Sequence, residues 1–117
     1  MSSKIVKKAW GNETIWADND KYCAKFLNFT KGSKFSMHFH AEKLETWYVL
    51  SGKFFLKWID TKNAKQYGQT LEIGQTWTNL QLVPHQLFCL EEGTIIEVST
   101  KDSEEDNYRV LPGDNQS

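Results

Sequence analysis

The stretch from Gly32 to Gly52 decides the fold, and it reads Gly-Ser-Lys-Phe-Ser-Met-His-Phe-His-Ala-Glu-Lys-Leu-Glu-Thr-Trp-Tyr-Val-Leu-Ser-Gly. His38 and His40 are two residues apart, so in a β-strand both imidazoles point to the same face. Glu45 follows a short polar interval that can turn the chain and return a carboxylate to the same place. Two imidazoles and a carboxylate on one side of a sheet form part of a metal site. Gly32 and Gly52 bracket the unit, where tight turns need a positive φ.

Strand-sized runs separated by turn residues follow one another along the whole chain. No segment shows a helical period with caps, and turn residues recur every eight to twelve residues or so, which is typical of all-β proteins. We expect strands over 22–30, 35–40, 46–50, 53–60, 66–71, 76–80, 86–90 and 94–99, with a tight hairpin at 51–52. The spacing of these runs favours an all-β sandwich or barrel.

Alternation within the strands predicts which side chains are buried. Strands with one apolar face must hide that face against another sheet. The side chains expected in the core on this ground are Phe54, Leu56, Trp58, Ile96 and Val98. The charged run 101–107 is expected to be a surface segment, and residues 112–117 a frayed tail.

Length and composition indicate one domain over residues 1–117, with about 1–4 and 112–117 flexible. Fourteen Lys and Arg against fifteen Asp and Glu give a net charge of −1, and the basic residues are scattered, so we expect neither a nucleic-acid nor a membrane partner. Cys23 and Cys89 are expected to be reduced thiols. The N-terminus has no apolar run of signal-peptide length, so a soluble cytoplasmic protein is expected.

The spacing of the decisive stretch resembles the first motif of the cupin superfamily. That motif has Gly32, five residues, His38, one residue, His40, four residues, Glu45, six residues and Gly52. The interval from Gly74 to His85 resembles the second motif of the same superfamily. The resemblance implies a double-stranded β-helix, or jelly roll, whose metal ligands are His38, His40, Glu45 and His85. It also implies one divalent transition metal, which would be Zn, Mn or Fe.

A narrower resemblance is to the cupin domain of bacterial mannose-6-phosphate isomerases. The segments that carry it are 6–11, 36–40, 43–47 and 96–109. It implies an isomerase or epimerase acting on a sugar or sugar phosphate, with Lys43 pairing with a phosphate or an enediolate and Tyr48 near the site. His38 stands where that family has Gln, and Lys43 where it has Arg. A lysine keeps the charge of an arginine but not its bidentate geometry.

Two other functions fit the same ligand set. Three histidines and a glutamate also suit Fe(II) in a dioxygenase. A cupin can also be a non-catalytic carbohydrate-binding module that keeps its metal for structure or for ligand orientation. For Lys43, the alternative is a solvated lysine in a turn.

Apolar residues near the N-terminus predict association into a homodimer. They lie outside both metal motifs and have no evident partner within so short a chain: Ile5, Val6, Trp10, Ile15 and Trp16. A two-fold dimer is the commonest way to cover such a surface. The alternative is that these residues cover one open end of their own barrel.

Overall fold

The computed structural model describes residues 2–113, and every regular element in this range is a β-strand. The strands are β1 (Lys4–Lys8), β2 (Gly11–Asp18), β3 (Tyr22–Phe29), β4 (Met37–Phe39), β5 (Glu45–Val49), β6 (Lys53–Asp60), β7 (Lys65–Leu71), β8 (Thr76–Asn79), β9 (His85–Glu91), β10 (Gly93–Thr100) and β11 (Tyr108–Leu111). Residues 2–113 accordingly hold no helix that could cross a membrane. Residues 114–117 of the expected tail lie outside the described range.

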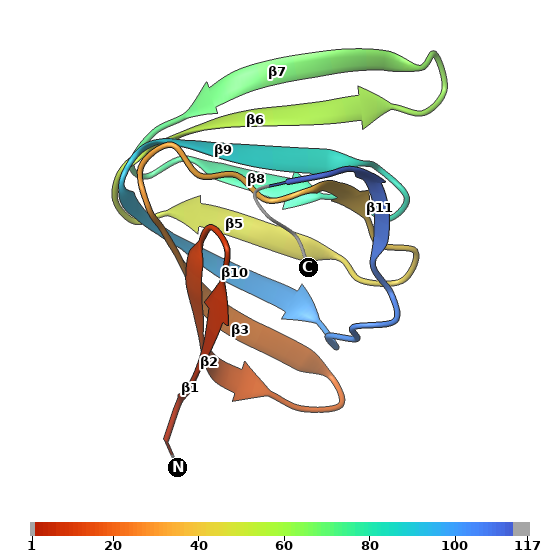
Figure 1. Cartoon of the computed structure of the whole chain (residues 1–117). Helices are drawn as coiled ribbons and strands as arrows, with labels where there is room; N and C mark the ends of the chain where they lie inside the picture. Colours follow the sequence, from red (N-terminus) through yellow and green to blue (C-terminus); the bar gives the residue numbers. More distant parts are fainter. Residues whose placement is uncertain (1, 114–117) are drawn as a thin grey trace.

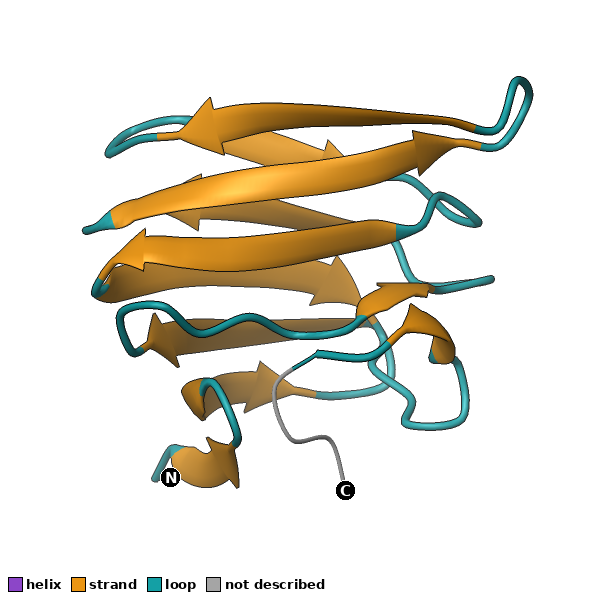
Figure 2. Cartoon of the chain, turned by 45° about the horizontal axis from the view of Figure 1, so that its top comes forward, coloured by secondary structure: helices purple, strands orange, loops and turns teal. Residues whose placement is uncertain are grey.

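Two antiparallel sheets face each other, as Figure 2 shows. One has six strands in the order β1-β2-β3-β10-β5-β8, and the other has five in the order β11-β4-β9-β6-β7. The chain crosses from one sheet to the other after β3, after β4, after β5, after β7, after β8, after β9 and after β10 (Figure 1). This alternation between sheets is the jelly roll that the sequence predicted.

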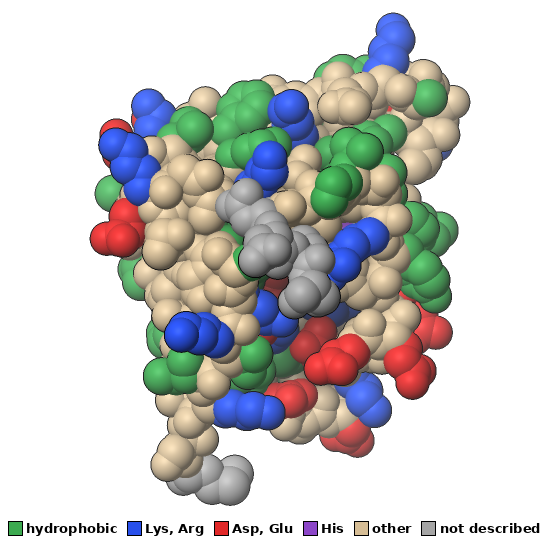
Figure 3. All heavy atoms as spheres, in the orientation of Figure 1, with side chains coloured by type: hydrophobic (Ala, Val, Ile, Leu, Met, Phe, Trp, Pro, Cys, Tyr) green, Lys and Arg blue, Asp and Glu red, His purple; other side chains and the backbone are tan. Residues whose placement is uncertain are grey.

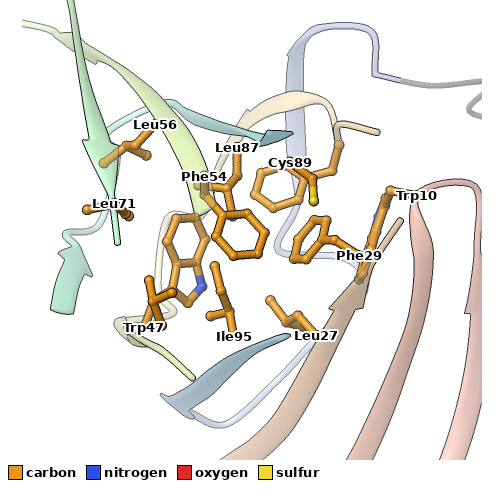
Figure 4. Close-up of a cluster of buried hydrophobic side chains, with 12 residues drawn as sticks. Trp10, Leu27, Phe29, Trp47, Phe54, Leu56, Leu71, Leu87, Cys89 and Ile95 are labelled. Carbon is orange, nitrogen blue, oxygen red and sulfur yellow. The ribbon is translucent and has the colours of Figure 1, made fainter. Parts of the chain in front are cut away.

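The core fills the space between the sheets with aromatic and aliphatic side chains (Figure 4). The ring of Trp10 stacks on Phe29 with centroids 4.4 Å apart, and Phe29 meets Phe54 edge-on at 5.2 Å. Such pairs add to the apolar area that each ring buries. Trp10 is therefore a core residue, which corrects its expected place on a dimer surface.

The expected core positions on β6 are confirmed for Phe54 and Leu56, which are fully buried, whereas Trp58 is only partly buried against the core. On β10 the expected face is wrong, because Ile96 is only partly buried and Val98 is exposed. On β10 the inward face carries Ile95 and Glu97, so Val98 is 48% exposed. Apolar residues occupy both faces of this strand, so alternation does not decide which face is inward. The inward face is the one that carries Glu97, which accepts a hydrogen bond from the indole N–H of Trp47 inside the sandwich.

The turn at Gly52 is not a hairpin. β5 pairs with β10 and β8, whereas β6 pairs with β7 and β9, so the turn carries the chain between sheets. Gly52 has a φ of 81°, and a Cβ there would lie 2.6 Å from the carbonyl oxygen of Glu91. Glycine is needed both for the backbone conformation and for this close approach.

The register of β10 predicts that truncating a side chain on its inner face lowers the free energy of unfolding more than truncating one on its outer face. Ile95→Ala removes a fully buried side chain and should lower the free energy of unfolding by about 2–4 kcal/mol. Val98→Ala, on the outer face, should lower it by less than about 1 kcal/mol. Urea denaturation followed by tryptophan fluorescence measures both values. Equal losses, or a larger loss for Val98→Ala, would show that the opposite face is the buried one.

Candidate metal centre

Three histidines meet between the sheets because β4 and β9 are neighbours. His38 lies on β4 directly opposite His85, the first residue of β9, and His40 follows β4 by one residue. The ring centroids of His38 and His85 are 4.6 Å apart, and those of His38 and His40 are 5.0 Å apart. One nitrogen from each ring lies within 4.8 Å of the other two. We call His38, His40 and His85 the histidine cluster.

A carboxylate from the opposite sheet joins the histidine cluster. Glu45 is the first residue of β5 and is almost fully buried. Its Oε1 lies 3.1 Å from Nε2 of His40 and 3.6 Å from Nε2 of His85. The four residues that the sequence proposed as ligands are thus brought to one place.

Backbone hydrogen bonds fix the orientation of all three rings. Each Nδ1 donates to a carbonyl oxygen: His38 to Ser36 at 2.8 Å, His85 to Val83 at 3.0 Å, and His40 to Asp106. A neutral imidazole that carries its proton on Nδ1 has a lone pair on Nε2. Metal-binding histidines are typically oriented in this way, by a hydrogen bond from the ring nitrogen that does not bind the metal.

The atoms that face one another at the centre are acceptors without donors. Among the described residues, Oε1 of Glu45 and Nε2 of His85 are buried and have no hydrogen-bond partner. The 3.1 Å approach of His40 to Glu45 is not aligned as a hydrogen bond. A buried polar atom without a partner costs about 1–3 kcal/mol. A divalent cation would satisfy these acceptors together, so the residues present fit a metal ion.

The protonation states of His38 and Glu45 also fit a metal ion. Burial, followed by the neighbouring His85, lowers the pKa of His38 to about 3, so the ring is neutral at physiological pH. Burial alone would raise the pKa of Glu45, but its contact with Glu97 and the charge of Lys43 hold it well below the usual range. Burial and the charge of Glu45 raise the pKa of Glu97 to about 8. Metal binding requires neutral imidazoles and ionised carboxylates, and these are the forms of His38 and Glu45.

A cavity of about 390 Å³ opens beside the histidine cluster. It is lined by side chains from β1 to β5, from β10 and from the connection between β10 and β11. His38 and His40 lie on its wall together with Lys25 and Lys43. A small molecule in this cavity would therefore meet both imidazoles and ammonium groups.

Lys43 lies in the cavity wall and is buried, so the alternative of a solvated turn lysine is wrong. Its Nζ is 3.1 Å from Oδ1 of Asp102 and 3.8 Å from Oε2 of Glu97. Burial alone would raise the pKa of Asp102, but the charges of Lys43 and Lys25 outweigh it and lower that pKa to about 2. The carboxylate of Asp102 is thus held ionised by two lysines.

Tyr48 does not lie near the cavity, which corrects its expected role. Its neighbours on β5, Trp47 and Val49, are buried, whereas Tyr48 is 42% exposed. Successive side chains on a strand point to opposite faces, so the inward direction of Glu45 and Trp47 sends Tyr48 outward.

The segment 101–107 supplies residues that the sequence pattern did not single out. The carboxylate of Asp106 accepts three backbone N–H bonds from the turn before β5: from Ala41 at 2.7 Å, Lys43 at 2.9 Å and Glu42 at 3.1 Å. Its carbonyl accepts the Nδ1 proton of His40. Asp106 therefore holds the turn that carries two of the proposed ligands. The run was expected at the surface because it is charged, and nothing in its local pattern marks the inward residues.

Comparison with known proteins identifies the fold family. The sequence profile of the family described as Cupin matches residues 21–115. The chain belongs to the cupin family. Cupin domains of oxalate decarboxylases are similar in structure: the enzyme of Bacillus subtilis, in its structure at pH 4.6, has a TM-score of 0.77 at 18% identity. The Lactobacillus farciminis enzyme, in its formate complex, has a TM-score of 0.80 at 13% identity.

These likenesses show the fold alone, because the identities are low. Each covers 92% of this cupin but only 30% and 34% of the two decarboxylase chains, so the chain spans about a third of their length. Another similar structure is of the Bacillus subtilis oxalate decarboxylase and concerns the Mn(II) centres of that enzyme. No curated protein matches this sequence.

Removing one ring should empty the proposed centre without unfolding the sandwich. We expect His38→Ala to lower the metal content of the purified protein to below about one tenth of the wild-type value, because one of four donors is lost. Elemental analysis by mass spectrometry measures the content, and Tyr48→Phe on the outer face of β5 is the matched control. Metal content unchanged in His38→Ala would contradict the assignment.

The pKa of Asp102 predicts a pH-dependent contribution to stability. Because its pKa is about 2 when folded, against an ordinary value of 3.8, the carboxylate stabilises the fold above about pH 4. That stabilisation is lost as the pH falls toward 2. The difference in unfolding free energy between wild type and Asp102→Asn should therefore shrink by up to about 2 kcal/mol between pH 5 and pH 2. A difference that stays constant over this range would contradict the ion pairs.

Proposed function

We propose that this cupin is a divalent-metal-dependent enzyme acting on a small, oxygen-rich molecule. The first candidate is isomerisation or epimerisation of a sugar or sugar phosphate. The observation that carries the proposal is that three histidine rings and the buried carboxylate of Glu45 lie close together beside a cavity whose wall also holds lysines. A structural metal site would have no need of the cavity or of the buried ammonium groups.

The histidine cluster and Glu45 would hold the cation from both sheets. A bound Zn²⁺, Mn²⁺ or Fe²⁺ would act as a Lewis acid on a carbonyl or hydroxyl oxygen of the substrate. The side chains around the site would have the same roles whichever of these metals is bound. Asp106 and Ser36 orient His40 and His38 through backbone carbonyls, and the side chain of Glu97 contacts that of Glu45.

Lys43 is the residue we assign to binding the substrate's anionic group. Its ammonium lies in the cavity wall, and it belongs to the segment 43–47 that resembles the mannose-6-phosphate isomerases. A lysine offers a point charge that can pair with a phosphate or with the oxyanion of an enediolate. Its position beside the proposed ligands supports a substrate that spans the metal and the ammonium group.

Turnover of sugar phosphates tests this function. Metal-loaded protein incubated with mannose 6-phosphate or fructose 6-phosphate should interconvert them, as followed by NMR. Stripping the metal should abolish the conversion, and Lys43→Met should slow it by at least about tenfold, because a charged contact to the substrate is lost. Oxygen uptake with candidate substrates would instead favour the dioxygenase, and saturable binding of sugars without turnover would favour a carbohydrate-binding module. The absence of all three would contradict a small-molecule function.

We also propose a homodimer formed through the β1–β2 hairpin, at the edge of the six-stranded sheet. Ile5 and Trp16 are exposed on this hairpin, whereas Val6 and Ile15 line the cavity of their own chain. Trp16→Ser should therefore shift the mass measured by light scattering from dimer toward monomer, while the buried Trp10 is left intact. A monomer mass for the wild-type protein at micromolar concentration would refute the dimer.

A further inference from the structure

Two buried lysines share one carboxylate in the cavity. Nζ of Lys25 lies 3.0 Å from Oδ2 of Asp102, and Nζ of Lys43 lies 3.1 Å from Oδ1 of the same side chain. The side chains of the two lysines are only 7% and 6% exposed. Each oxygen of Asp102 thus pairs with a different ammonium, as the two oxygens of a bound ligand carboxylate would.

Lys25 is held by a strand and Lys43 by a hydrogen-bonded turn, whereas the carboxylate lies on an irregular connection. Lys25 lies on β3, which is hydrogen-bonded to β2 on one side and to β10 on the other. The backbone N–H of Lys43 donates to Asp106 at 2.9 Å. Asp102, in contrast, lies on the irregular connection from β10 to β11, and its side chain is 29% exposed. The carboxylate therefore reaches the lysines from the open side of the cavity.

We propose that Lys25 and Lys43 form an anion-binding subsite that Asp102 occupies when no ligand is present. The ligand group that replaces Asp102 is a small oxyanion, either a carboxylate or a phosphate. This inference deepens the proposed function by naming the charge of its substrate, and it rests on that function only for the idea that the bound molecule is a substrate.

Charge balance favours an exchange of one anion for another. A buried ammonium without a partner costs several kcal/mol, so an anion between the two lysines is strongly favoured. The other carboxylates nearby lie farther away: Glu13 is 3.5 Å from Lys25, and Glu97 is 3.8 Å from Lys43. An incoming oxyanion that takes the place of Asp102 keeps the close ion pairs and leaves the local charge unchanged, while Asp102 turns toward water.

The connection that carries Asp102 is anchored on both sides of it. Thr100 donates its backbone N–H to Leu44 at 3.0 Å, and Asp106 is tied to the turn before β5. The displacement therefore involves only residues 101–105. Figure 3 shows acidic and basic side chains gathered around the place where Figure 1 draws this connection. The cavity can thus exchange its anion without disturbing either sheet.

The position of the subsite limits what the ligand can be. Lys25 and Lys43 line the same cavity as His38 and His40. One molecule can therefore place its anionic group between the lysines and an oxygen donor toward the histidine cluster. This arrangement fits a short hydroxy acid, a keto acid or a sugar phosphate, and it disfavours a neutral sugar.

Anion titration of two charge-matched variants tests the proposal. Sulfate and acetate, as probes of the two oxyanion shapes, are titrated into wild type, Asp102→Asn and Glu13→Gln, and the side-chain NMR signals of the lysines are followed. Each variant removes one negative charge beside Lys25, but only Asp102→Asn vacates the place between both lysines. If the displaced state of wild type is populated at about a tenth or less, Asp102→Asn should bind a probe at least about tenfold more tightly than wild type. Glu13→Gln should gain less than about threefold.

Several results would overturn the proposal. Equal gains in the two variants would show a general electrostatic effect and no subsite. Failure of Asp102→Asn to fold would show that its carboxylate is a permanent structural partner. Tight binding that survives Lys25→Met in the Asp102→Asn background would place the anion elsewhere. Tighter binding of acetate would indicate a carboxylate ligand, and tighter binding of sulfate would indicate a phosphate-like ligand.

The titrations are run on protein as purified and again after removal of divalent cations. Because the two lysines do not hold the metal, the tenfold gain should persist in the stripped protein. Anion binding that persists without any metal-dependent turnover would leave the subsite standing and reject the proposed enzyme. Turnover without the gain would reject the subsite alone.

Discussion

The structure depends on a buried group of hydrogen-bond acceptors that face one another between the two sheets without a donor. Three imidazoles give their Nδ1 protons to backbone carbonyls, and Nε2 of His40 and of His85 lies close to the carboxylate of Glu45. Buried acceptors gathered around an ionised carboxylate are costly inside a protein unless a donor or a cation satisfies them. A divalent cation at the centre of this arrangement would stabilise it by satisfying these acceptors together. The two sheets, which supply the ligands from opposite sides, are joined at this point.

A second layer of charge explains why polar residues occupy core positions. Glu97 takes an inward place on β10 that an apolar residue could fill, and Trp47 donates an indole N–H to it at 2.9 Å. Lys43 and Lys25 lie beyond it, paired with Asp102. Buried ion pairs are often no more stabilising than apolar residues of the same volume would be, and local rules of core packing are commonly broken where a protein has a function. The polar wall of the cavity is therefore best understood as part of a binding site.

Short-range patterns predicted the all-β class and the grouping of His38, His40 and Glu45, and the resemblance to cupins added the jelly roll and His85. The spacing of His38 and His40 places two rings on one face of β4, and strand and turn residues alternate clearly from β3 to β10. The register of β10 was mispredicted because Ile95 and Ile96 are both apolar, so alternation alone could not choose a face. The expected hairpin at Gly52 was wrong because a tight turn does not reveal whether its strands pair.

The residues that the sequence analysis missed act over long range. Lys25 and Asp102 are 77 residues apart in the chain, and Asp106 is tied to His40 across 66 residues. No local periodicity marks such partners, and a charged segment looks solvated until its partners are known. Glu97 alone carried a usable signal, since a glutamate between isoleucine and valine in a strand needs a buried partner if its face is inward.

X-ray absorption spectroscopy at the metal edge of zinc-loaded protein tests the central claim most directly. The account predicts a first shell of nitrogen and oxygen atoms at about 2.0–2.2 Å, with the outer-shell scattering of three imidazole rings. A shell of sulfur atoms at about 2.3 Å, or the spectrum of a hydrated ion without imidazole scattering, would contradict it.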